Sequence, residues 1–306
     1  MIMPTGVMLR INPSAANAID GLIADARRAH DIGVKQIWLA QQADIDAIAA
    51  AGLIGAAVPG LGVGTAVVPI NPRHPLVISA AAQTAQAAAH GNFTLGLGLG
   101  ARVIEHYAFG IDRTNTVNRL HEYLQVLRGA FERGDANFRG AEYSIELQWP
   151  VQVAGGTPIP IYVAAMGPKA LRITGEYADG TLPYLAGPRT LSEFIVPTIN
   201  DAAEAAGRPQ PRVTAMVPVV LSDDAETARR TAAEQLAFYA TIPSYQKVIA
   251  REGISDLTEL AALGSPDQVR EKLQSYLDAG ATDVVLSPLQ VEQNDLEELW
   301  AVAASL

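Results

Sequence analysis

The chain has 306 residues, of which 49% are hydrophobic, so it can bury a large core as one large domain or two ordinary ones. It contains no cysteine, which excludes disulfides, thiolate metal sites and cysteine nucleophiles. Its net charge of −10 argues against nucleic acid or an anionic membrane as a general partner, because both require basic surfaces.

The N-terminal sequence MIMPTGVMLRI lacks the basic segment and apolar stretch of a secretion signal, so we expect a cytoplasmic protein. The longest uncharged run extends from Ala47 to Pro72, a length that could span a bilayer. Pro59 and Gly60 interrupt it, however, and its second half, LGVGTAVV, has the pattern of a buried strand. The run therefore predicts a helix, a turn and a strand, with no membrane partner.

Short apolar or β-branched segments alternate with alanine-rich helical segments along the chain. The predicted strands cover residues 6–11, 36–40, 61–68, 93–100, 160–165, 179–185, 212–220 and 282–287. The segments between them carry apolar residues at three-to-four spacing, and several end at a glycine, which is typical of helices that pack one face on a core. Apolar strands in strict alternation with helices indicate parallel strands covered by helices.

Eight strand and helix units predict an α/β fold, a (β/α)8 TIM barrel with insertions that residues 1–306 form as a single domain. One insertion is expected at 136–158, where Arg139-Gly140 and Gly155-Gly156 are turn signals. The other is the charged helical stretch 222–264 before the last unit. Neither insertion has the length or apolar content of an independent domain.

Residues 95–101, LGLGLGA, match the G-x-G-x-x-G/A spacing of dinucleotide-binding loops through Gly96, Gly98 and Ala101. The context argues against such a loop, because the glycines alternate within a predicted strand instead of following the first strand. In a barrel they belong to the fourth strand. Gly96 is expected to relieve crowding, whereas Gly98 and Gly100, nearest the carboxyl end of the strand, are expected to let a flat ring approach.

The segment VAAMGPKAL, residues 163–171, joins a predicted strand to a helix that should begin at Pro168. Proline is favoured at the first helical position, and the free backbone N–H groups of Met166, Gly167 and their neighbours then point outward at the helix N-terminus. This arrangement predicts an anion site, to which Lys169 adds a positive charge. An ordinary barrel turn with a solvated lysine is the alternative.

Several motifs, taken together, resemble one family. They are QIWLAQQ at the second strand, GVGTAVVPINPRHPLVISAAAQTA at the third strand and its helix, LGLGLG at the fourth, and IPIYVAAMGPKALRITGEYADGT across the fifth and sixth. In this order they resemble the bacterial luciferase-like superfamily over roughly residues 6–290. The resemblance is closest to its deazaflavin-dependent oxidoreductases, which use coenzyme F420 and include methylenetetrahydromethanopterin reductases and glucose-6-phosphate dehydrogenases.

The resemblance implies an oxidoreductase that transfers a hydride between coenzyme F420 and a small organic substrate. It places the cofactor phosphate in the turn after the fifth strand, and a non-prolyl cis peptide between Ala66 and Val67 behind the central ring of the cofactor. The cofactor-binding residues that it implies are Gln41, Thr65, Ala66, Val67, Gly98, Gly100, Ala164, Ala165, Met166, Gly167, Pro168 and Lys169. It also implies a homodimer that uses the helices beside the second and third strands.

Many family members supply proton transfer from an acidic residue and a histidine after the second strand, and some from a glutamate after the fourth. This chain has Gln41 and Gln42 at the first place and Ala101 at the second. An amide cannot transfer a proton at neutral pH, but it can hydrogen-bond a ring carbonyl or a substrate oxygen, so Gln42 is a predicted catalytic-site residue. The proton donor is then sought among residues that have helix-start or packing roles as alternatives: Glu105, His106 and His74.

Reduction of an iminium-like carbon needs no proton from the enzyme, so the sequence favours a chemistry like that of methylenetetrahydromethanopterin reductases over alcohol oxidation. Two other functions stay open: an FMN-dependent luciferase-like monooxygenase and a non-catalytic flavin-binding protein. The five histidines show no metal-binding spacing, so no metal site is expected. The walls of the substrate pocket are expected to come from loops after the strands, including Tyr184, Tyr239 and Tyr245.

Overall fold

The computed structural model describes residues 5–112, 115–289 and 293–306. The chain forms two compact units, each built from segments that are separate in the sequence. The first unit comprises Met1–Trp38, Leu182–Thr198 and Arg212–Leu306, and the second comprises Leu39–Thr181 and Ile199–Pro211. The single domain expected over residues 1–306 stays a prediction.

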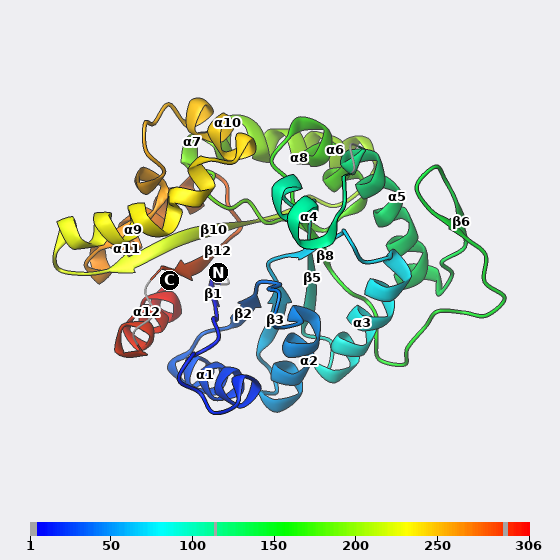
Figure 1. Cartoon of the computed structure of the whole chain (residues 1–306), viewed down its shortest axis with the longest axis horizontal. Coiled ribbons are helices and arrows are strands. Elements are labelled where there is room, and N and C mark those ends of the chain that lie inside the picture. Colours follow the sequence, from blue (N-terminus) through cyan, green and yellow to red (C-terminus); the bar gives the residue numbers. More distant parts are fainter. Residues whose placement is uncertain (1–4, 113–114, 290–292) are drawn as a thin grey trace. The chain divides into compact units, whose positions relative to one another are not determined.

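Strands and helices alternate along the chain, as the apolar pattern predicts (Figure 1). The strands are β1 (Thr5–Met8), β2 (Gln36–Leu39), β3 (Gly62–Thr65), β4 (Val68–Pro69), β5 (Phe93–Gly98), β6 (Phe138–Arg139), β7 (Ser144–Ile145), β8 (Ile161–Ala164), β9 (Gly180–Thr181), β10 (Arg212–Leu221), β11 (Ala262–Gly264) and β12 (Asp283–Pro288). The α-helices are α1 (Ala18–Ile32), α2 (Ala47–Ala57), α3 (Pro75–Ala88), α4 (Arg102–Phe109), α5 (Thr116–Arg128), α6 (Pro168–Tyr177), α7 (Pro188–Thr190), α8 (Val196–Ala205), α9 (Ala225–Ala240), α10 (Pro243–Glu252), α11 (Pro266–Asp278) and α12 (Gln293–Ser305). This order of elements is that of a (β/α)8 barrel with insertions.

The eight predicted strands are all present, and most are shorter than predicted. The third is divided into β3 and β4, with Ala66 and Val67 between them. The insertion 136–158 contains the antiparallel pair β6 and β7, in which Phe138 pairs with Ile145. The stretch 222–264 contains α9 and α10, as predicted, and also β11, whose three residues are too few to show a strand pattern in the sequence.

In the second unit, β3, β5, β8 and β9 are parallel neighbours in that order, and β4 also pairs with β5. Leu95 and Leu97 of β5 and Val163 of β8 are completely buried, as expected for parallel strands covered by helices. Helices α2 and α3 pack on each other, and α5 packs on α6 (Figure 1). The predicted site residues lie at the carboxyl ends of these parallel strands, which meet at one edge of the sheet.

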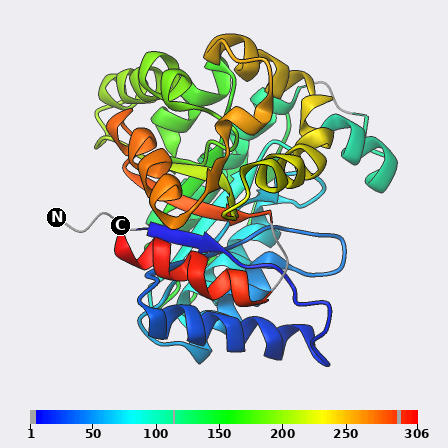
Figure 2. The same ribbon diagram turned by 90° about the vertical axis from the view of Figure 1, so that its left-hand side faces the viewer.

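In the first unit, β11, β10, β12, β1 and β2 are parallel neighbours in that order. Figure 2 shows α12, in red, beside α1, in blue, and both helices contact their neighbours in this unit through buried side chains such as Trp300. Asn17 caps α1 by accepting the N–H groups of Ile19 at 2.9 Å and Asp20 at 3.2 Å. Gly33 ends this helix in the left-handed region.

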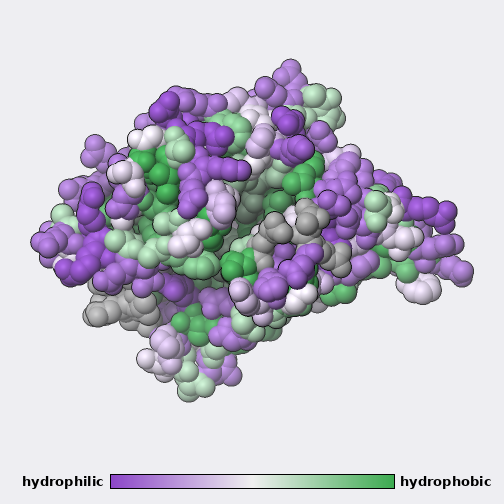
Figure 3. Space-filling view, turned by 45° about the horizontal axis from the view of Figure 1, so that its top comes forward, coloured by the Kyte–Doolittle hydropathy of each residue, from purple (hydrophilic) through white to green (hydrophobic). Residues whose placement is uncertain are grey.

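Exposed apolar side chains occur on several helices and loops, and include Leu53, Val77, Val103, Ile104, Tyr107, Phe109, Trp149 and Phe238. The face of the molecule in Figure 3 is mostly hydrophilic, with smaller apolar areas between the charged side chains. Within the part of the chain that the structure describes, no helix combines the length and the apolar character needed to cross a lipid bilayer.

Candidate active site

The carboxyl ends of three neighbouring strands in the second unit carry the predicted cofactor segments. Gly98, the last residue of β5, pairs with Pro69 of β4 on one side and with Ala164 of β8 on the other. The N–H of Ile70 donates to the carbonyl oxygen of Gly98 at 2.9 Å. Barrel enzymes assemble their active sites at this end of the strands. The register therefore brings the residues predicted on the third, fourth and fifth strands to one edge.

The Ala66–Val67 peptide bond between β3 and β4 is cis, which confirms the position that the family resemblance implies. The N–H of Ala66 donates to the carbonyl oxygen of Leu39 at 2.7 Å, and the N–H of Gln41 donates to that of Val67 at 3.4 Å. Thr65 is completely buried, and its hydroxyl oxygen both donates to and accepts from the backbone of Gly96 at 2.9 Å. Thr65 thus joins β3 to β5, and Ala66 and Val67 are left half-buried beside them.

The two glycines predicted to admit a flat ring have other reasons to be glycine. A Cβ on Gly98 would lie 2.5 Å from the Cγ2 of Val67, closer than side-chain atoms approach one another. Gly100 has φ of +81°, in the left-handed region that favours glycine, and its Cβ position is occupied by the carboxylate of Glu105. Contact within the protein therefore accounts for both residues, and ring approach at these positions stays a prediction.

The turn after β8 has open space at the start of α6. Pro168 is the first helical residue, and Gly167 precedes it in an extended conformation with φ of −103°. Apart from Gly167 and its two chain neighbours, no atom of the described residues lies within 4 Å of the position that a Cβ on Gly167 would take. Lys169 is exposed and forms no ion pair with the described residues. The backbone N–H groups of the first helical turn have no helical acceptor, so this turn fits an anionic group such as a phosphate.

The two glutamines after β2 differ in what their side chains contact. The Gln41 Nε2 donates to the carbonyl oxygens of Gln42 and Ile45, both at 2.8 Å. Its Oε1 accepts from the N–H of Ala47 at 3.1 Å and from the guanidinium of Arg73 at 3.0 Å. The Gln41 amide therefore stabilises its own loop, whereas the Gln42 side chain is exposed. Of the two, Gln42 has the amide that is available to a ligand.

The predicted proton donors Glu105 and His106 are adjacent in α4 but lie in different environments. Glu105 is only 3% exposed, and its Oε1 accepts a hydrogen bond from the Asn71 Nδ2 at 3.1 Å. The Nδ1 of His106 lies 2.7 Å from the Oδ1 of Asp112, and the imidazole is half exposed. Successive helical residues project about 100° apart, which explains the separation. Glu105 lies inside the unit beside Gly100, and His106 lies at the surface.

Three buried polar residues were missed by the sequence reasoning: Asn71 and Arg119, which are hydrogen-bonded to each other near this site, and Glu122, which accepts backbone N–H groups of residues 141–143. The Arg119 guanidinium donates to the Asn71 Oδ1 at 2.6 Å and lies 3.4 Å from the Glu142 carboxylate. Asn71, Arg119 and Glu122 are each less than 9% exposed. In the sequence, the position of Asn71 in the motif NPRHP is the one feature that could have indicated these buried residues. The helical spacing of Arg119 and Glu122 gives no such indication, because surface residues share it. Burial of polar groups is a tertiary property.

His74, the third candidate proton donor, lies at the start of a helix, as its alternative role predicted. Its Nδ1 accepts the N–H of Leu76 at 3.2 Å, which caps α3. Its ring packs edge-on against Tyr143, with the ring centres 5.3 Å apart. Burial lowers the pKa of His74, and the positive charge of Arg119 lowers it further. The side chain is therefore neutral near pH 7, and its contacts are structural.

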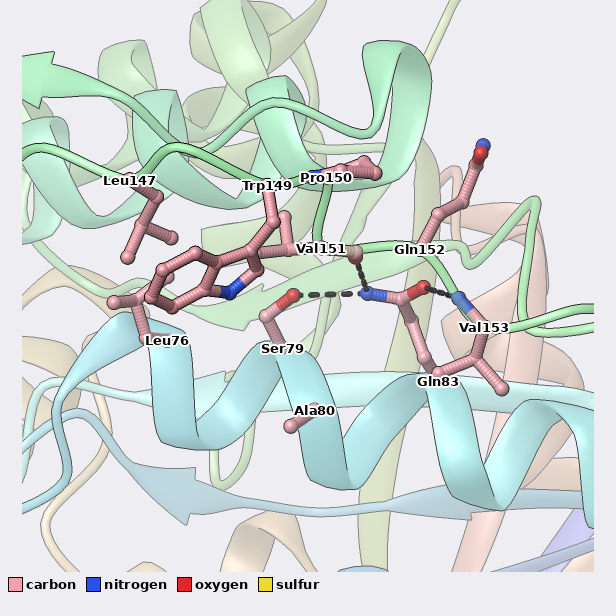
Figure 4. A pocket seen from close by; sticks show the side chains of 10 residues that line it. All are labelled: Leu76, Ser79, Ala80, Gln83, Leu147, Trp149, Pro150, Val151, Gln152 and Val153. Carbon is pink, nitrogen blue, oxygen red and sulfur yellow. Dashed lines mark hydrogen bonds between the residues drawn. The ribbon is translucent and has the colours of Figure 1, made fainter.

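A cavity of about 360 Å³ lies elsewhere, between α3 and the segment 147–153. In Figure 4 the Trp149 indole extends over Leu76, and Gln83 is hydrogen-bonded to Ser79 and to the backbone of the segment. None of the predicted cofactor residues lines this cavity. Across residues 5–112, 115–289 and 293–306 the structure contains no group of three or more metal-ligating side chains.

Comparison with known proteins identifies the family. The profile of the Luciferase-like monooxygenase family matches residues 3–283, and the chain belongs to this family. A curated relative, the F420-dependent glucose-6-phosphate dehydrogenase of Kineococcus radiotolerans, is 26% identical over 303 residues, which cover 89% of this chain and 88% of the relative.

Two solved structures show the same fold at low sequence identity. The coenzyme F420 dependent tetrahydromethanopterin reductase of Methanopyrus kandleri aligns with a TM-score of 0.81 and 20% identity, over 99% of this chain and 97% of that one. The oxygenating constituent of the 3,6-diketocamphane monooxygenase of Pseudomonas putida, in complex with FMN, aligns with a TM-score of 0.75 and 18% identity. The alignment covers 100% of this chain and 99% of that one. The chain therefore has the luciferase-like (β/α)8 barrel fold that its sequence predicts.

Proposed function

We propose that the protein is an oxidoreductase that transfers a hydride between coenzyme F420 and a small organic substrate. The observation that carries the proposal is the open N-terminus of α6, with the exposed Lys169 beside it, at the same strand edge as the Ala66–Val67 peptide. Membership of the luciferase-like family and the F420-dependent relative support the choice of cofactor.

In this proposal the backbone of the Ala164–Lys169 turn binds the cofactor phosphate, and Lys169 adds an exposed positive charge. Ala66 and Val67, half-buried between β3 and β4, support the ring from behind. When bound, F420 supplies the site that gives or accepts the hydride. The Gln42 amide is free to hydrogen-bond a ring carbonyl or a substrate oxygen.

Of the three candidate proton donors, Glu105 is the best placed, and His74 caps α3. Its carboxylate lies against Gly100 at the carboxyl end of β5, and the Asn71 amide fixes it there. His106 is paired with Asp112 at the surface, which leaves its Nε2 as the ring nitrogen without a described partner. A substrate that accepts a hydride at an iminium-like carbon would need neither residue as a proton donor.

The turn before α6 would suit the phosphate of FMN as well as that of F420, and the fold is shared with an FMN-bound monooxygenase. An FMN-dependent monooxygenase is therefore the second candidate function, and a non-catalytic flavin-binding protein is the third. Titration of the full-length protein with F420 and with FMN, followed by calorimetry, distinguishes the first two. We expect F420 to bind more tightly, and equal or reversed affinities would contradict the proposal.

Two variants test the phosphate turn in the same titration. Gly167→Val should fold normally, because the extended backbone accepts a β-branched residue and the Cβ meets open space, but its side chain should fill the cradle and weaken F420 binding at least about tenfold. Lys169→Ala should weaken binding several-fold, and less so at high salt. The exposed Lys35, replaced by alanine, is the control for loss of a positive charge. Unchanged binding by Gly167→Val would refute the site.

We also propose that the protein is a homodimer that uses α2 and α3. Leu53 on α2 and Val77 on α3 support this proposal, because they are 49% and 59% exposed on two helices that pack side by side. Light scattering during gel filtration should give twice the chain mass, and Val77→Lys should shift the mass toward one chain. The cytoplasmic location expected from the sequence stays a prediction.

A further inference from the structure

Three tyrosines of the first unit pack against one another in a cluster outside the predicted cofactor site. The ring centres of Tyr184 and Tyr239 are 5.2 Å apart, those of Tyr239 and Tyr245 are 5.3 Å apart, and those of Tyr184 and Tyr245 are 6.4 Å apart. All three pairs are edge-to-face, with interplanar angles of 67°, 87° and 90°. Each ring is only half-buried, so the cluster forms part of the protein surface.

The backbone holds Tyr184 firmly. Tyr184 forms a parallel bridge with Met216 of β10, and the N–H of Met216 donates to the carbonyl oxygen of Pro183 at 2.9 Å. The next residue, Leu185, is completely buried with φ of +53°, a left-handed conformation that is rare for a leucine and costly outside a constrained site. The Tyr184 hydroxyl is hydrogen-bonded to Ser287, near the carboxyl end of β12. Strained backbone of this kind occurs more often at ligand sites than elsewhere.

A cation lies at the same end of the strands as Ser287, because β1 and β12 are paired with Val7 opposite Leu286. Arg10 follows the carboxyl end of β1, is exposed, and forms no ion pair with the described residues. Burial raises the pKa of the Tyr184 and Tyr239 hydroxyls, and the Arg10 guanidinium opposes this on both. The guanidinium and two phenolic hydroxyls are all hydrogen-bond donors.

We propose that Arg10, Tyr184 and Tyr239 form a binding subsite for an organic anion with a flat, apolar body. The guanidinium binds the carboxylate or a similar acidic group of the ligand, as its planar donor fork is suited to do. The tyrosine rings contact the flat body through their faces and edges. Arg10 and Ser287 lie at the carboxyl ends of β1 and β12, the end of the strands at which barrel enzymes bind their ligands.

Simple packing of three tyrosines would not require the arginine. A cluster that served packing alone would gain nothing from an exposed guanidinium near the phenolic hydroxyls, whereas a subsite for an anion would use it. The two interpretations differ in their dependence on ligand charge. Binding of a flat anion should require Arg10, and binding of a flat neutral molecule of the same shape should not.

The subsite can be tested without cofactor or turnover. Benzoate is a flat anion, and benzamide is its neutral counterpart. We expect the full-length protein to bind benzoate, measured by saturation-transfer NMR and titration, at least about tenfold more tightly than benzamide. Arg10→Gln should remove most of this preference, Arg10→Lys should retain part of it, and Tyr239→Phe should weaken benzoate binding several-fold.

Arg229→Gln, which removes an exposed arginine of α9 in the same unit, is the matched control and should bind benzoate like the wild type. Thermal unfolding of each variant establishes that it folds. The proposal is overturned if benzamide binds as tightly as benzoate, or if Arg10→Gln leaves benzoate binding unchanged. Failure of F420 binding with intact, Arg10-dependent benzoate binding would instead refute the proposed function and leave the anion subsite standing.

Discussion

Val67 and Gly98 are in contact across β4 and β5, and this contact explains a glycine that the sequence reasoning assigned to ligand approach. The Val67 Cγ2 occupies the space where a Cβ of residue 98 would lie. A β-branched side chain has little rotamer freedom with which to move aside. The identity of residue 98 is thus set first by its neighbour within the protein.

Gly98→Ala is therefore expected to lower the free energy of unfolding by about 1–3 kcal/mol, the usual cost of overpacking. Combining it with Val67→Ala should recover part of that loss, because the second change removes the overlapping methyl group. Gly167→Ala is the control and should be nearly neutral, since its Cβ meets no atom within 4 Å. Urea unfolding is measured for the wild type, Gly98→Ala, Val67→Ala, the double variant and Gly167→Ala, and strictly additive losses in the double variant would contradict the proposed overlap.

Glu105 and His106 show how far a sequence can locate a site at the level of single residues. Their place just past the fourth strand correctly predicts that they lie near the carboxyl end of β5. The sequence could not tell which of the two side chains is buried. Burial of Glu105 depends on Asn71, 34 positions away, whose side-chain amide donates a hydrogen bond to the Glu105 carboxylate. The same holds for Gln41, whose side-chain oxygen accepts a hydrogen bond from Arg73, 32 positions along the chain.

Helix α5 and the insertion 136–158 are joined by one carboxylate. Glu122 accepts the backbone N–H groups of Ala141, Glu142 and Tyr143 at 2.9, 2.8 and 3.0 Å. Burial of Glu122 raises its pKa, but these three hydrogen bonds and one from Asn118 outweigh burial, so the pKa is lowered overall. The segment between β6 and β7 is therefore stabilised by the ionised form of Glu122.

A folded-state pKa below the unfolded value adds stability above the unfolded pKa, and this stability is lost as the pH falls through the folded pKa. Glu122→Gln should therefore cost about 1.5–3 kcal/mol at pH 7, and the difference from wild type should shrink below about pH 4. Urea unfolding at a series of pH values measures this difference in the free energy of unfolding. Glu132→Gln, which removes a half-exposed carboxylate paired with Arg128, should cost less than about 1 kcal/mol. A pH-independent loss in Glu122→Gln would contradict this account.

The start of α6 is an element whose boundary the sequence predicted to the residue. Pro168 fixes the first helical position, and it does so through its own ring and missing N–H, without help from distant residues. The strand β11 is the opposite case. Its three residues form a strand because Val219, Val220 and Leu221 of β10 pair with them, and no local pattern indicates this.

At the scale of the whole molecule, the two compact units share one chain that passes from one to the other four times, after Trp38, Thr181, Thr198 and Pro211. Neither unit is continuous in sequence, so neither is expected to fold without the other. We predict a single cooperative unfolding transition in calorimetry, with equal calorimetric and van't Hoff enthalpies, and coincident curves from circular dichroism and tryptophan fluorescence. Two resolved transitions would show instead that the units are independent domains.

The sequence by itself determined the alternation of strands and helices, the barrel class, the cis peptide position implied by the family motifs and the helix that begins at Pro168. These features follow from local patterns or from motifs whose residues are adjacent in the chain. The tertiary structure decided which polar groups are buried and what they contact, as with Glu105, Asn71 and Arg119, and which tyrosines pack together, as with Tyr184 and Tyr239. Such contacts join residues tens to hundreds of positions apart, and only the folded chain fixes their partners.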